Sequence, residues 1–423
     1  TPHFRIIYPV TFSAEAQKYA RLLEESYSEV RHLYPGIKRR MPVIVHNYSM
    51  QSNGYVTWAP RRMELYPLPG QDNLPMDPAK QLVLHETAHV LQISSLNRGP
   101  GKVLSFFLGE QAMGMTALIV PAWAFEGDAV YAETVFTASG RGRSNVFLQG
   151  AKALTLGQEG IYGYDKRLSG SYRDFTPDHY VFGYLMMNKL RSMASFGERT
   201  AMLSVAGMPG NNHLSTTQKK KGIISRPVLF DSTFNDLEEI WSGHDDPGTF
   251  YNYPGLSAAS RIDYVNHYLP QRLDGNSIIS LKTSMSAPSA FVITNPVDGT
   301  EQLLTTTGYI YPYIFSYAGG TIVWSELHPD PRWDNLDYSV IKRMSISGGP
   351  VTQLTYRSRY TSPDLSPDGR TIAAVSSTPE FSYSLVLLDA FNGSVISEVA
   401  VPVNTVIQRP SWSSDGKTVT VVS

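Results

Sequence analysis

Two histidines and a glutamate stand at a spacing that suits metal-dependent hydrolysis. The stretch QLVLHETAHVLQ, residues 81–92, places His85 and His89 four positions apart, with Glu86 beside the first. A chain with ten histidines in 423 residues is expected to contain roughly 0.02 such windows by chance. We therefore interpret the motif as a candidate zinc site with its catalytic base, in preference to a helix whose two histidines bind no metal.

The residues around the motif predict a buried helix. Apolar positions such as Leu84 and Leu91 recur with no glycine or proline between them, and Pro78 lies near the start, where proline is tolerated. Residues four apart lie on one helix face, so both imidazoles can bind one ion. Glu86 is displaced by about 100°, which suits a base acting on a zinc-activated water better than a ligand.

A catalytic zinc site needs a third protein ligand and an open position for water. The metzincin pattern would supply that ligand with a histidine shortly after the motif, but this chain has Gln92 and Ser95 at the diagnostic positions. The segment VPAWAFEGDAVYAET, residues 120–134, predicts a tightly packing helix rich in small residues. An acid in such an apolar run is costly unless it is paired or bound to metal, so Glu126 is predicted to be the third ligand.

The same predicted helix carries acids for a supporting role. Glu133 lies nearly two turns from Glu126 on a similar face, and Asp128 lies between them. Histidines that bind zinc usually donate their second ring N–H to a carboxylate or carbonyl. Glu133, or else Asp128, is predicted to hydrogen-bond a ligand histidine rather than the metal.

Together these residues resemble a known family. The His-Glu-x-x-His motif followed by W-x-x-E-G-x-A-x-Y-x-E at residues 123–133 is similar to the gluzincin metallopeptidases. The layout resembles the bacterial peptidase MA-like group, in which such a domain precedes a TolB-like propeller. The resemblance implies His85, His89 and Glu126 as zinc ligands, Glu86 as base, and a peptide or protein substrate that pairs with the edge strand of a sheet.

The implied mechanism is metal-assisted hydrolysis, in which Glu86 takes a proton from water and passes it to the leaving amine. The oxyanion that forms needs a second electrophile. The segment SYRDFTPDHYVFGYLMMNKL, residues 171–190, predicts a helix that starts near Asp178. Tyr180 is the first candidate for the electrophile and His179 the second, while Tyr184 is at least as well explained as a core aromatic.

Two further polar segments favour structural interpretations. Glu64, in RRMEL at residues 61–65, is interpreted as an exposed strand residue in preference to a substrate anchor. The stretch SGRGRS, residues 139–144, is interpreted as a glycine-rich surface loop, with contact to an anionic substrate as the alternative.

Composition narrows the classes of partner. A net charge of −1 gives no indication of a nucleic-acid partner or an acidic membrane surface. The apolar run at residues 103–123 contains Glu110 and ends near Pro121, which favours packed helices or one-sided membrane contact over a transmembrane span. The absence of cysteine rules out disulfides and fits a bacterial envelope or secreted protein. No export signal opens the sequence, so one is expected to have been removed or omitted.

The periodicity changes along the chain. Residues 1–75 alternate strand and helix patterns and predict a small mixed sheet, and residues 145–242 are mainly helical in pattern. From about residue 263 short strands with turn glycines take over. Aligned repeat positions fall at Ile278, Ile322, Ile372 and Val419, and repeated turn glycines fall at Gly299, Gly349 and Gly393. Periods of this length are typical of propeller blades, and SPDGRTIAAVSS resembles a TolB-like blade.

We therefore expect a multidomain chain. Residues 1–242 are predicted to form an α+β zincin-like metallopeptidase domain, and residues 263–423 an all-β propeller of about three blades, incomplete in this chain and implying a longer polypeptide. Between them, residues 243–262 form an aromatic-rich linker. Its rings, Phe250, Tyr251 and Tyr253 with Tyr264 nearby, are predicted to pack between the two domains or to cap the helical one.

Two functions remain open. The first is a zinc metallopeptidase whose propeller gates or recruits its substrate, or binds a protein partner. The second is a non-catalytic envelope binding protein, in which the propeller recognises a partner or glycan on a peptidase-like scaffold. The intact set of His85, Glu86, His89 and Glu126 favours the first.

Overall fold

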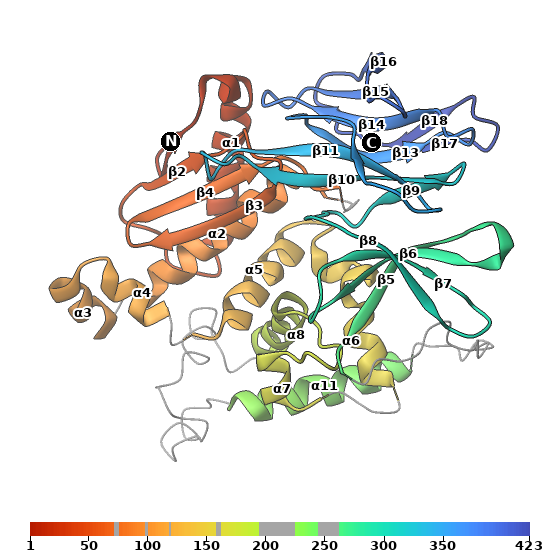
Figure 1. Cartoon of the computed structure of the whole chain (residues 1–423). Coiled ribbons are helices and arrows are strands. Elements are labelled where there is room, and N and C mark those ends of the chain that lie inside the picture. Colours follow the sequence, from red (N-terminus) through yellow and green to blue (C-terminus); the bar gives the residue numbers. More distant parts are fainter. Residues whose placement is uncertain (72–75, 98–99, 118–119, 158–161, 194–224, 244–261) are drawn as a thin grey trace.

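The structure, a computed structural model, describes residues 1–71, 76–97, 100–117, 120–157, 162–193, 225–243 and 262–423 (Figure 1). It combines a mixed helix-and-sheet part at the N-terminal end with a series of antiparallel sheets at the C-terminal end. Among the described residues, no helix combines the length and the apolar character that crossing a membrane requires.

The N-terminal part is built on a four-stranded sheet with the strand order β1-β2-β4-β3. Its strands are β1 (Phe4–Ile7), β2 (Met41–Val45), β3 (Ser52–Trp58) and β4 (Arg61–Pro67). The first three strands in that order run parallel, while β3 is antiparallel to β4 and forms the edge. Alternate residues such as Val43, Met63 and Leu65 are fully buried, and the mixed sheet expected for residues 1–75 is present.

Helices cover one face of this sheet and continue into a helical layer. They are α1 (Ser13–Val30), α2 (Pro78–Leu96), α3 (Pro100–Leu108), α4 (Gln111–Ala117), α5 (Ala122–Phe136), α6 (Asn145–Leu156), α7 (Tyr164–Ser169), α8 (His179–Ser192) and α11 (Arg226–Ser242). Asp77 caps α2 by accepting from the backbone N–H of Ala79 at 2.8 Å, and Asp178 caps α8 in the same way. Helix α2 lies beside β3 and packs on α1 and α5.

Two glycines let α5 and α8 touch through their backbones. A Cβ added at Gly127 would lie 2.0 Å from the carbonyl carbon of Gly183, and one added at Gly183 would lie 1.9 Å from the carbonyl oxygen of Trp123. No larger residue fits either position without moving a helix. The small residues that predict a tightly packing helix at residues 120–134 thus fix α5 against α8, and with it Glu126 against Tyr180.

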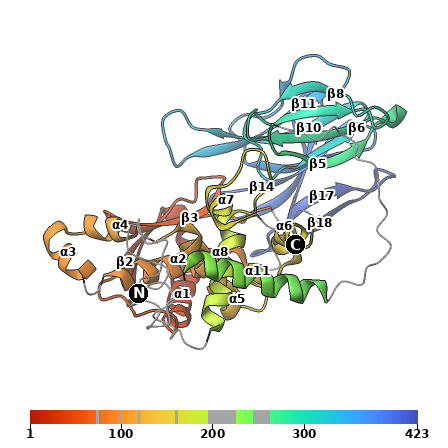
Figure 2. The same cartoon turned by 90° about the horizontal axis from the view of Figure 1, so that it is seen from below.

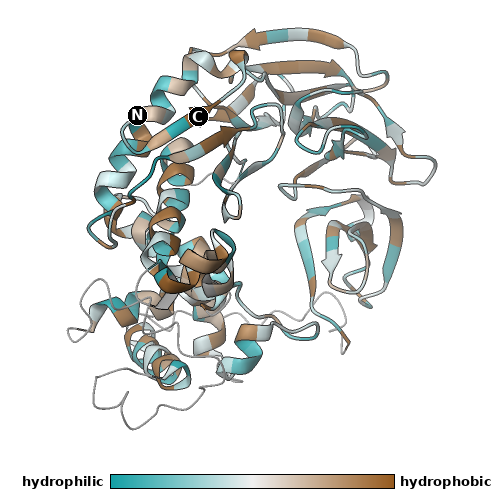
Figure 3. Cartoon of the chain, turned by 90° about the vertical axis from the view of Figure 1, so that its left-hand side faces the viewer, coloured by the Kyte–Doolittle hydropathy of each residue, from teal (hydrophilic) through white to brown (hydrophobic). Residues whose placement is uncertain are grey.

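The C-terminal part consists of three four-stranded antiparallel sheets and one two-stranded sheet. The first sheet contains β5 (Val265–Arg272), β6 (Ile278–Ser284), β7 (Ala290–Thr294) and β8 (Glu301–Thr306), and the second contains β9 (Phe315–Ala318), β10 (Thr321–Pro329), β11 (Asp337–Ser345) and β12 (Thr352–Gln353). The third sheet contains β13 (Tyr360–Leu365), β14 (Thr371–Ser377), β15 (Tyr383–Asp389) and β16 (Val395–Ala400). The two-stranded sheet contains β17 (Gln408–Trp412) and β18 (Val419–Val422). Figure 3 shows the sheets following one another in an arc opposite the helices.

The repeat positions found in the sequence are equivalent in the structure. Ile278, Ile322, Ile372 and Val419 lie in β6, β10, β14 and β18, the second strand of each sheet. The repeated glycines lie in the turns between third and fourth strands and have positive φ: 70° at Gly299, 110° at Gly349 and 74° at Gly393. The blade organisation and its count, three sheets and the start of a fourth, are as expected. Among the described strands, no pairing closes the sheets into a ring.

The sheets dock on the N-terminal part through the loop after β2. Asp337, at the start of β11, accepts hydrogen bonds from Ser49 Oγ at 2.9 Å and Gln51 Nε2 at 3.0 Å, and another from the Met50 backbone N–H. An apolar cluster joins the two parts beside it and contains Met50, Leu68, Val375, Tyr383 and Ile407. The two parts therefore share a buried interface.

The expected aromatic linker falls largely outside the described residues, including Phe250, Tyr251 and Tyr253. Tyr264 is described: its backbone N–H donates to the carbonyl of Tyr172 at 2.6 Å, and its ring centroid lies 5.2 Å from that of Phe175. This ring packs on the helical part immediately before β5 begins.

Candidate metal centre

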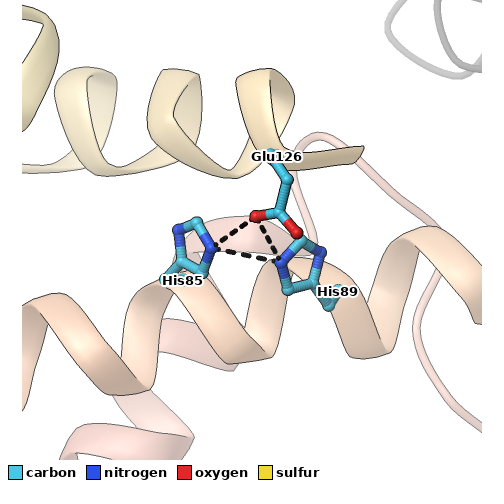
Figure 4. A group of neighbouring side chains, drawn as sticks. All are labelled: His85, His89 and Glu126. Carbon is cyan, nitrogen blue, oxygen red and sulfur yellow. Dashed lines mark hydrogen bonds and ion pairs between the residues drawn. The ribbon is translucent and has the colours of Figure 1, made fainter. Parts of the chain in front are cut away.

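Helices α2 and α5 bring together three side chains from segments far apart in the sequence. His85 Nε2 lies 3.1 Å from His89 Nε2 and 3.1 Å from Glu126 Oε2, and His89 Nε2 lies 3.3 Å from the same carboxylate oxygen (Figure 4). The two histidines point from one face of α2, as their spacing of four requires. The three side chains that the sequence predicts as ligands thus converge on one point.

The spacing of these atoms fits a tetrahedral zinc ion. Ligand atoms about 2.0 Å from a tetrahedral ion lie about 3.3 Å from one another, which matches all three distances. Two imidazoles and one carboxylate are a donor set that zinc takes in catalytic sites, where the fourth position remains for water. The residues present therefore fit the ion.

Each histidine has a partner for its other ring nitrogen. His85 Nδ1 lies 2.7 Å from Glu133 Oε1, and His89 Nδ1 lies 2.8 Å from Gln92 Oε1. Gln92 is held in turn, because its Nε2 donates to the carbonyl of Phe125 at 3.0 Å. Carboxylate and amide oxygens beside Nδ1 favour a proton there, which directs the Nε2 lone pairs towards the centre of the triangle.

Glu133 lies where the sequence predicts it, and Asp128 does not. Glu133 is fully buried and touches His85, whereas the equally buried Asp128 pairs with Arg191 Nε and Nη2 at 2.5 and 2.9 Å. The supporting role proposed for Asp128 is therefore corrected. It neutralises Arg191 between α5 and α8, because its position two residues after Glu126 turns it to another helix face.

Sequence reasoning missed Arg141. Its Nε and Nη2 donate to Glu133 at 2.8 and 2.5 Å, and its guanidinium carbon lies 5.2 Å from the centre of the Tyr180 ring. Interpreting SGRGRS as a surface loop is therefore wrong for this residue. The signal was the flanking glycines: a Cβ at Gly140 would lie 2.4 Å from the Glu133 carbonyl oxygen, so the loop passes directly over α5.

Opposite charges set the protonation of the site. Burial alone would raise the pKa of Glu133, but the Arg141 guanidinium beside it lowers that pKa to about 2. Burial lowers the pKa of His85, but the hydrogen bonds with Glu126 and Glu133 outweigh burial and raise it to about 9. Burial opposes ionisation of Glu126 as well, yet the two histidines hold the pKa of its carboxyl well below the usual range.

Glu86 differs from every other acid in the site. Its side chain is 3 % exposed, and its Oε2 has no hydrogen-bond partner within the part of the chain that the structure describes. It lies against the backbone of β3, where a Cβ at Gly54 would be 2.7 Å from its Cγ. Burial raises the pKa of this carboxyl above its ordinary value. Glu86 thus combines a raised pKa with a buried oxygen that lacks a partner among the described residues, next to the two histidines.

A cavity of about 470 Å³ opens over these groups. Its walls come from α2, α5 and the edge strand β3, whose residues 52–56 run along it. Two residues from the C-terminal sheets, Tyr311 and Gln408, complete the lining. A concave site with a few convergent polar groups, placed where two structural units meet, is the usual setting of ligand binding.

The two candidates for the second electrophile lie in different environments. Tyr180 lines the cavity, and its ring centroid lies 6.0 Å from that of His85. His179 precedes it but is exposed, and it does not contribute to the cavity lining. Tyr184 is buried and packs on Phe147 with ring centroids 6.2 Å apart, as expected of a core aromatic.

Glu64 is not the exposed strand residue that alternation predicts. It is 5 % exposed on the sheet face away from the helices, where His46 Nε2 lies 2.7 Å from its Oε2 and Arg62 Nε contacts its Oε1. The ring of Tyr66 stacks on His46 at 4.7 Å, and its hydroxyl reaches Asn335 at 2.7 Å. This face is covered in part by the β10–β11 connection, which sequence periodicity within β4 does not reveal.

Comparisons with known proteins give a fold likeness only. No protein-family model matches the chain, and no curated protein does. Among solved structures, a TolB of Agrobacterium tumefaciens is 23% identical over 39% of this chain with a TM-score of 0.31, and TolB of Acinetobacter baumannii is 20% identical over 39% with a TM-score of 0.30. The propeller domain of the Trilobed protease of Pyrococcus furiosus is 15% identical over 34%, with a TM-score of 0.26.

The chain spans 56%, 39% and 45% of the length of these three proteins. Likeness at this level assigns no activity. The C-terminal part is described as propeller-like because of its own repeated four-stranded sheets.

Proposed function

We propose that the chain is a zinc metallopeptidase of the gluzincin type, hydrolysing peptide bonds in a cavity shared by its helical part and its propeller-like sheets. One observation carries the proposal. Three side-chain atoms, from His85, His89 and Glu126, form a triangle of 3.1–3.3 Å, and Glu86, the residue after His85, has a buried Oε2 without a hydrogen-bond partner among the described residues. A structural histidine pair needs neither the third ligand nor such a carboxyl.

The chain's own groups divide the chemistry. Zinc, when bound, supplies a Lewis acid that lowers the pKa of water to about 7 and polarises a carbonyl. Glu86 receives the proton of the attacking water and delivers it to the leaving amine; its raised pKa brings it closer to the operating pH, as suits a group that both takes and gives a proton. Glu133 and Gln92 hold the ligand imidazoles in orientation.

In this proposal Tyr180, which lines the cavity, donates a hydrogen bond to the developing oxyanion. Burial and the nearby Glu126 raise the pKa of its phenol to about 12, so the hydroxyl keeps its proton at neutral pH. Arg141, whose guanidinium carbon lies 5.2 Å from the centre of this ring, lines the same cavity. Donors fixed in place before the reaction stabilise such charge without reorganising.

The cavity also limits how a substrate can lie. Strand β3 pairs only with β4 in its sheet and leaves its other edge along the cavity, where an extended peptide can add as a further strand. Tyr311 and Gln408 face the same space from the sheets, so a peptide bound there meets both parts of the chain. We propose that the sheets frame and select extended substrates in this way, and that the enzyme works in the bacterial envelope or outside the cell.

The test is Glu86→Gln, which preserves shape and removes the base. Wild type is expected to cleave an unstructured protein, and the variant to lose about 10²–10⁴-fold in rate while retaining one zinc per chain by elemental analysis. Glu239→Gln, at an exposed position of α11, is the matched control and should leave the rate unchanged. Zinc-loaded wild type that cleaves neither unstructured proteins nor a peptide library would favour the non-catalytic binding protein instead.

A further inference from the structure

Helix α3 turns apolar side chains to the solvent. Phe106 is 84%, Phe107 75% and Val103 61% exposed, and Leu104 and Leu108 are also exposed. The first three stand at positions i, i+3 and i+4, so they form one stripe along the helix. A monomeric soluble protein seldom exposes a contiguous apolar patch of this kind unless the patch binds something.

The polar side of α3 faces the body of the protein. Ser105 Oγ donates to Asn97 Oδ1 at 3.3 Å, and Lys102 and Ser105 line a groove of about 630 Å³ between α3 and the sheet. Phe106, Phe107 and Val103 take no part in that lining. The helix is therefore amphipathic in the inverted sense: its polar face lies towards the protein, and its apolar face lies outward.

Positive charge collects around this helix although the chain as a whole carries −1. The same groove is lined by Lys38, Arg39, Arg61 and Lys102, with Glu110 as its single carboxylate. Lys38, Arg39 and Lys102 are exposed. An apolar stripe next to a cationic cluster complements a surface that offers hydrocarbon beneath a layer of anionic groups.

The position of α3 permits contact with an extended plane. In two views related by a 90° turn, α3 lies at the outermost left end of the molecule, beyond the sheet and away from the C-terminal sheets (Figures 1 and 2). None of its residues lines the cavity over His85 and Glu86. A flat surface could reach α3 and leave the entrance of the cavity uncovered.

We propose that α3 docks the protein on the surface of an anionic phospholipid bilayer. Val103, Phe106 and Phe107 enter the boundary between headgroups and acyl chains, while Lys38, Arg39 and Lys102 contact lipid phosphates. The nine-residue helix is about 14 Å long, too short to cross a bilayer but sufficient to lie in its interface. The surface adds a location for the protein and does not depend on the proposed hydrolysis.

A second copy of the chain suits this surface less well. A two-fold dimer would set the same patch against itself and bring the cluster of Lys38, Arg39, Arg61 and Lys102 opposite an identical cluster. Like charges facing each other oppose association, whereas anionic headgroups attract the cluster. The stripe of three side chains on a nine-residue helix is also a small contribution to the area that a stable dimer buries.

Vesicle flotation with the full chain tests the proposal. Wild type should float with vesicles of phosphatidylcholine and phosphatidylglycerol, bind phosphatidylcholine vesicles more weakly, and lose the difference as salt is raised. Phe106→Ser with Phe107→Ser should weaken binding at least about tenfold. Phe391→Ser, at a phenylalanine that is 62% exposed in the third sheet, is the matched control and should bind as wild type does.

A second pair of variants tests the charge. Lys38→Glu with Arg39→Glu should abolish the preference for anionic vesicles, while Lys417→Glu, exposed in the last sheet, should keep it. Metal-free protein should bind vesicles as the zinc-loaded form does, so a failure of the hydrolysis proposal leaves this result unaffected. The proposal is overturned if the wild-type protein does not bind anionic vesicles. It is also overturned if the wild type binds no vesicles but forms a dimer in solution that Phe106→Ser with Phe107→Ser converts to a monomer.

Discussion

Helices α2 and α3 follow each other in the chain, but α2 buries polar side chains whereas α3 exposes apolar ones. In α2, His85 is 8% and Glu86 3% exposed, and both line the cavity. In α3, Phe106 and Phe107 are 84% and 75% exposed. The usual rule places imidazoles and carboxylates outside and phenylalanines inside, so the two helices break it in opposite directions.

The two helices differ in what stabilises their unusual side chains. The polar groups of α2 are stabilised from within the chain: His85 by Glu126 and Glu133, and His89 by Gln92. Among the described residues of this site, Glu86 alone has a fully buried oxygen without a partner, and it is the group to which we assign proton transfer. The apolar stripe of α3 stays exposed among the residues that the structure describes, and we propose that its stabilisation comes from a surface outside the protein.

The largest effect is expected at Glu126, the metal ligand that we propose on α5. Glu126→Ala removes one of three protein ligands and should weaken zinc binding by about a thousandfold, since the ligands share a binding free energy of about 10–16 kcal/mol. Competition with a chelator of known affinity measures it. Glu238→Ala, exposed on α11, serves as control. Full zinc occupancy of the purified Glu126→Ala protein would contradict the assignment of α5 to the site.

The protonation of His85 predicts a pH dependence of the same site. Its pKa of about 9 in the metal-free protein means that zinc must displace a proton below pH 9, so zinc affinity should rise by nearly tenfold per pH unit well below pH 9, by about fiftyfold from pH 7 to 9, and then level off. The sign for stability follows. A pKa raised from 6.5 stabilises the metal-free fold below pH 6.5, and that contribution is lost as the pH rises through 9.

Chelator competition and thermal unfolding at matched pH values check both statements. The rise in Tm that zinc produces should grow between pH 6.5 and 9, because the metal-free protein loses stability while zinc binds more tightly. A zinc affinity that stays flat over this interval would show that His85 is already neutral there and that the pairing with Glu126 and Glu133 does not set its charge.

A smaller loss of zinc affinity is expected at Glu133, which contacts His85 rather than the proposed zinc ion. Glu133→Gln keeps an oxygen near His85 Nδ1 but removes the charge that Arg141 balances, and zinc affinity should fall about ten- to a hundredfold. Asp128→Asn is a close control, because Asp128 is equally buried on the same helix and equally paired with an arginine, but with no contact to a ligand. It should lower stability and leave zinc affinity unchanged; equal losses of affinity in both variants would mean that α5 acts only through its fold.

The sequence reveals the metal site more fully than its surroundings, for a physical reason. The helix period alone places His85 and His89 together, and the cost of burying an acid draws attention to the acids of residues 120–134, of which Glu126 is one. The role of Arg141 is not predictable in this way, because its contact with Glu133 depends on how closely a loop passes α5. The flanking glycines permit that close approach but do not require it. Gln92 lies three residues after His89 on the same helix, so the same periodicity places it beside that histidine.

The C-terminal sheets show the same division. Turn glycines and strand alternation are local, so the blade repeats are visible in the sequence and lie in equivalent strands. The docking of Asp337 on the loop at residues 49–51 joins positions nearly 290 apart and has no local signature. The cationic cluster at α3 cannot be predicted from the net charge, because a total of −1 does not say where in the fold the individual charges lie.

The smallest expected effect is the sharpest test of how α2 and α3 differ. Phe106→Ser removes a large apolar side chain, but one that is 84% exposed, so the free energy of unfolding should change by no more than about 0.5 kcal/mol. Leu84→Ala, in the fully buried face of α2, should cost about 2–5 kcal/mol. Denaturant unfolding of both variants gives the two values. A cost of several kcal/mol at Phe106 would mean that the ring is packed in solution, whereas near-neutrality together with lost vesicle binding shows a side chain that is retained for an external surface.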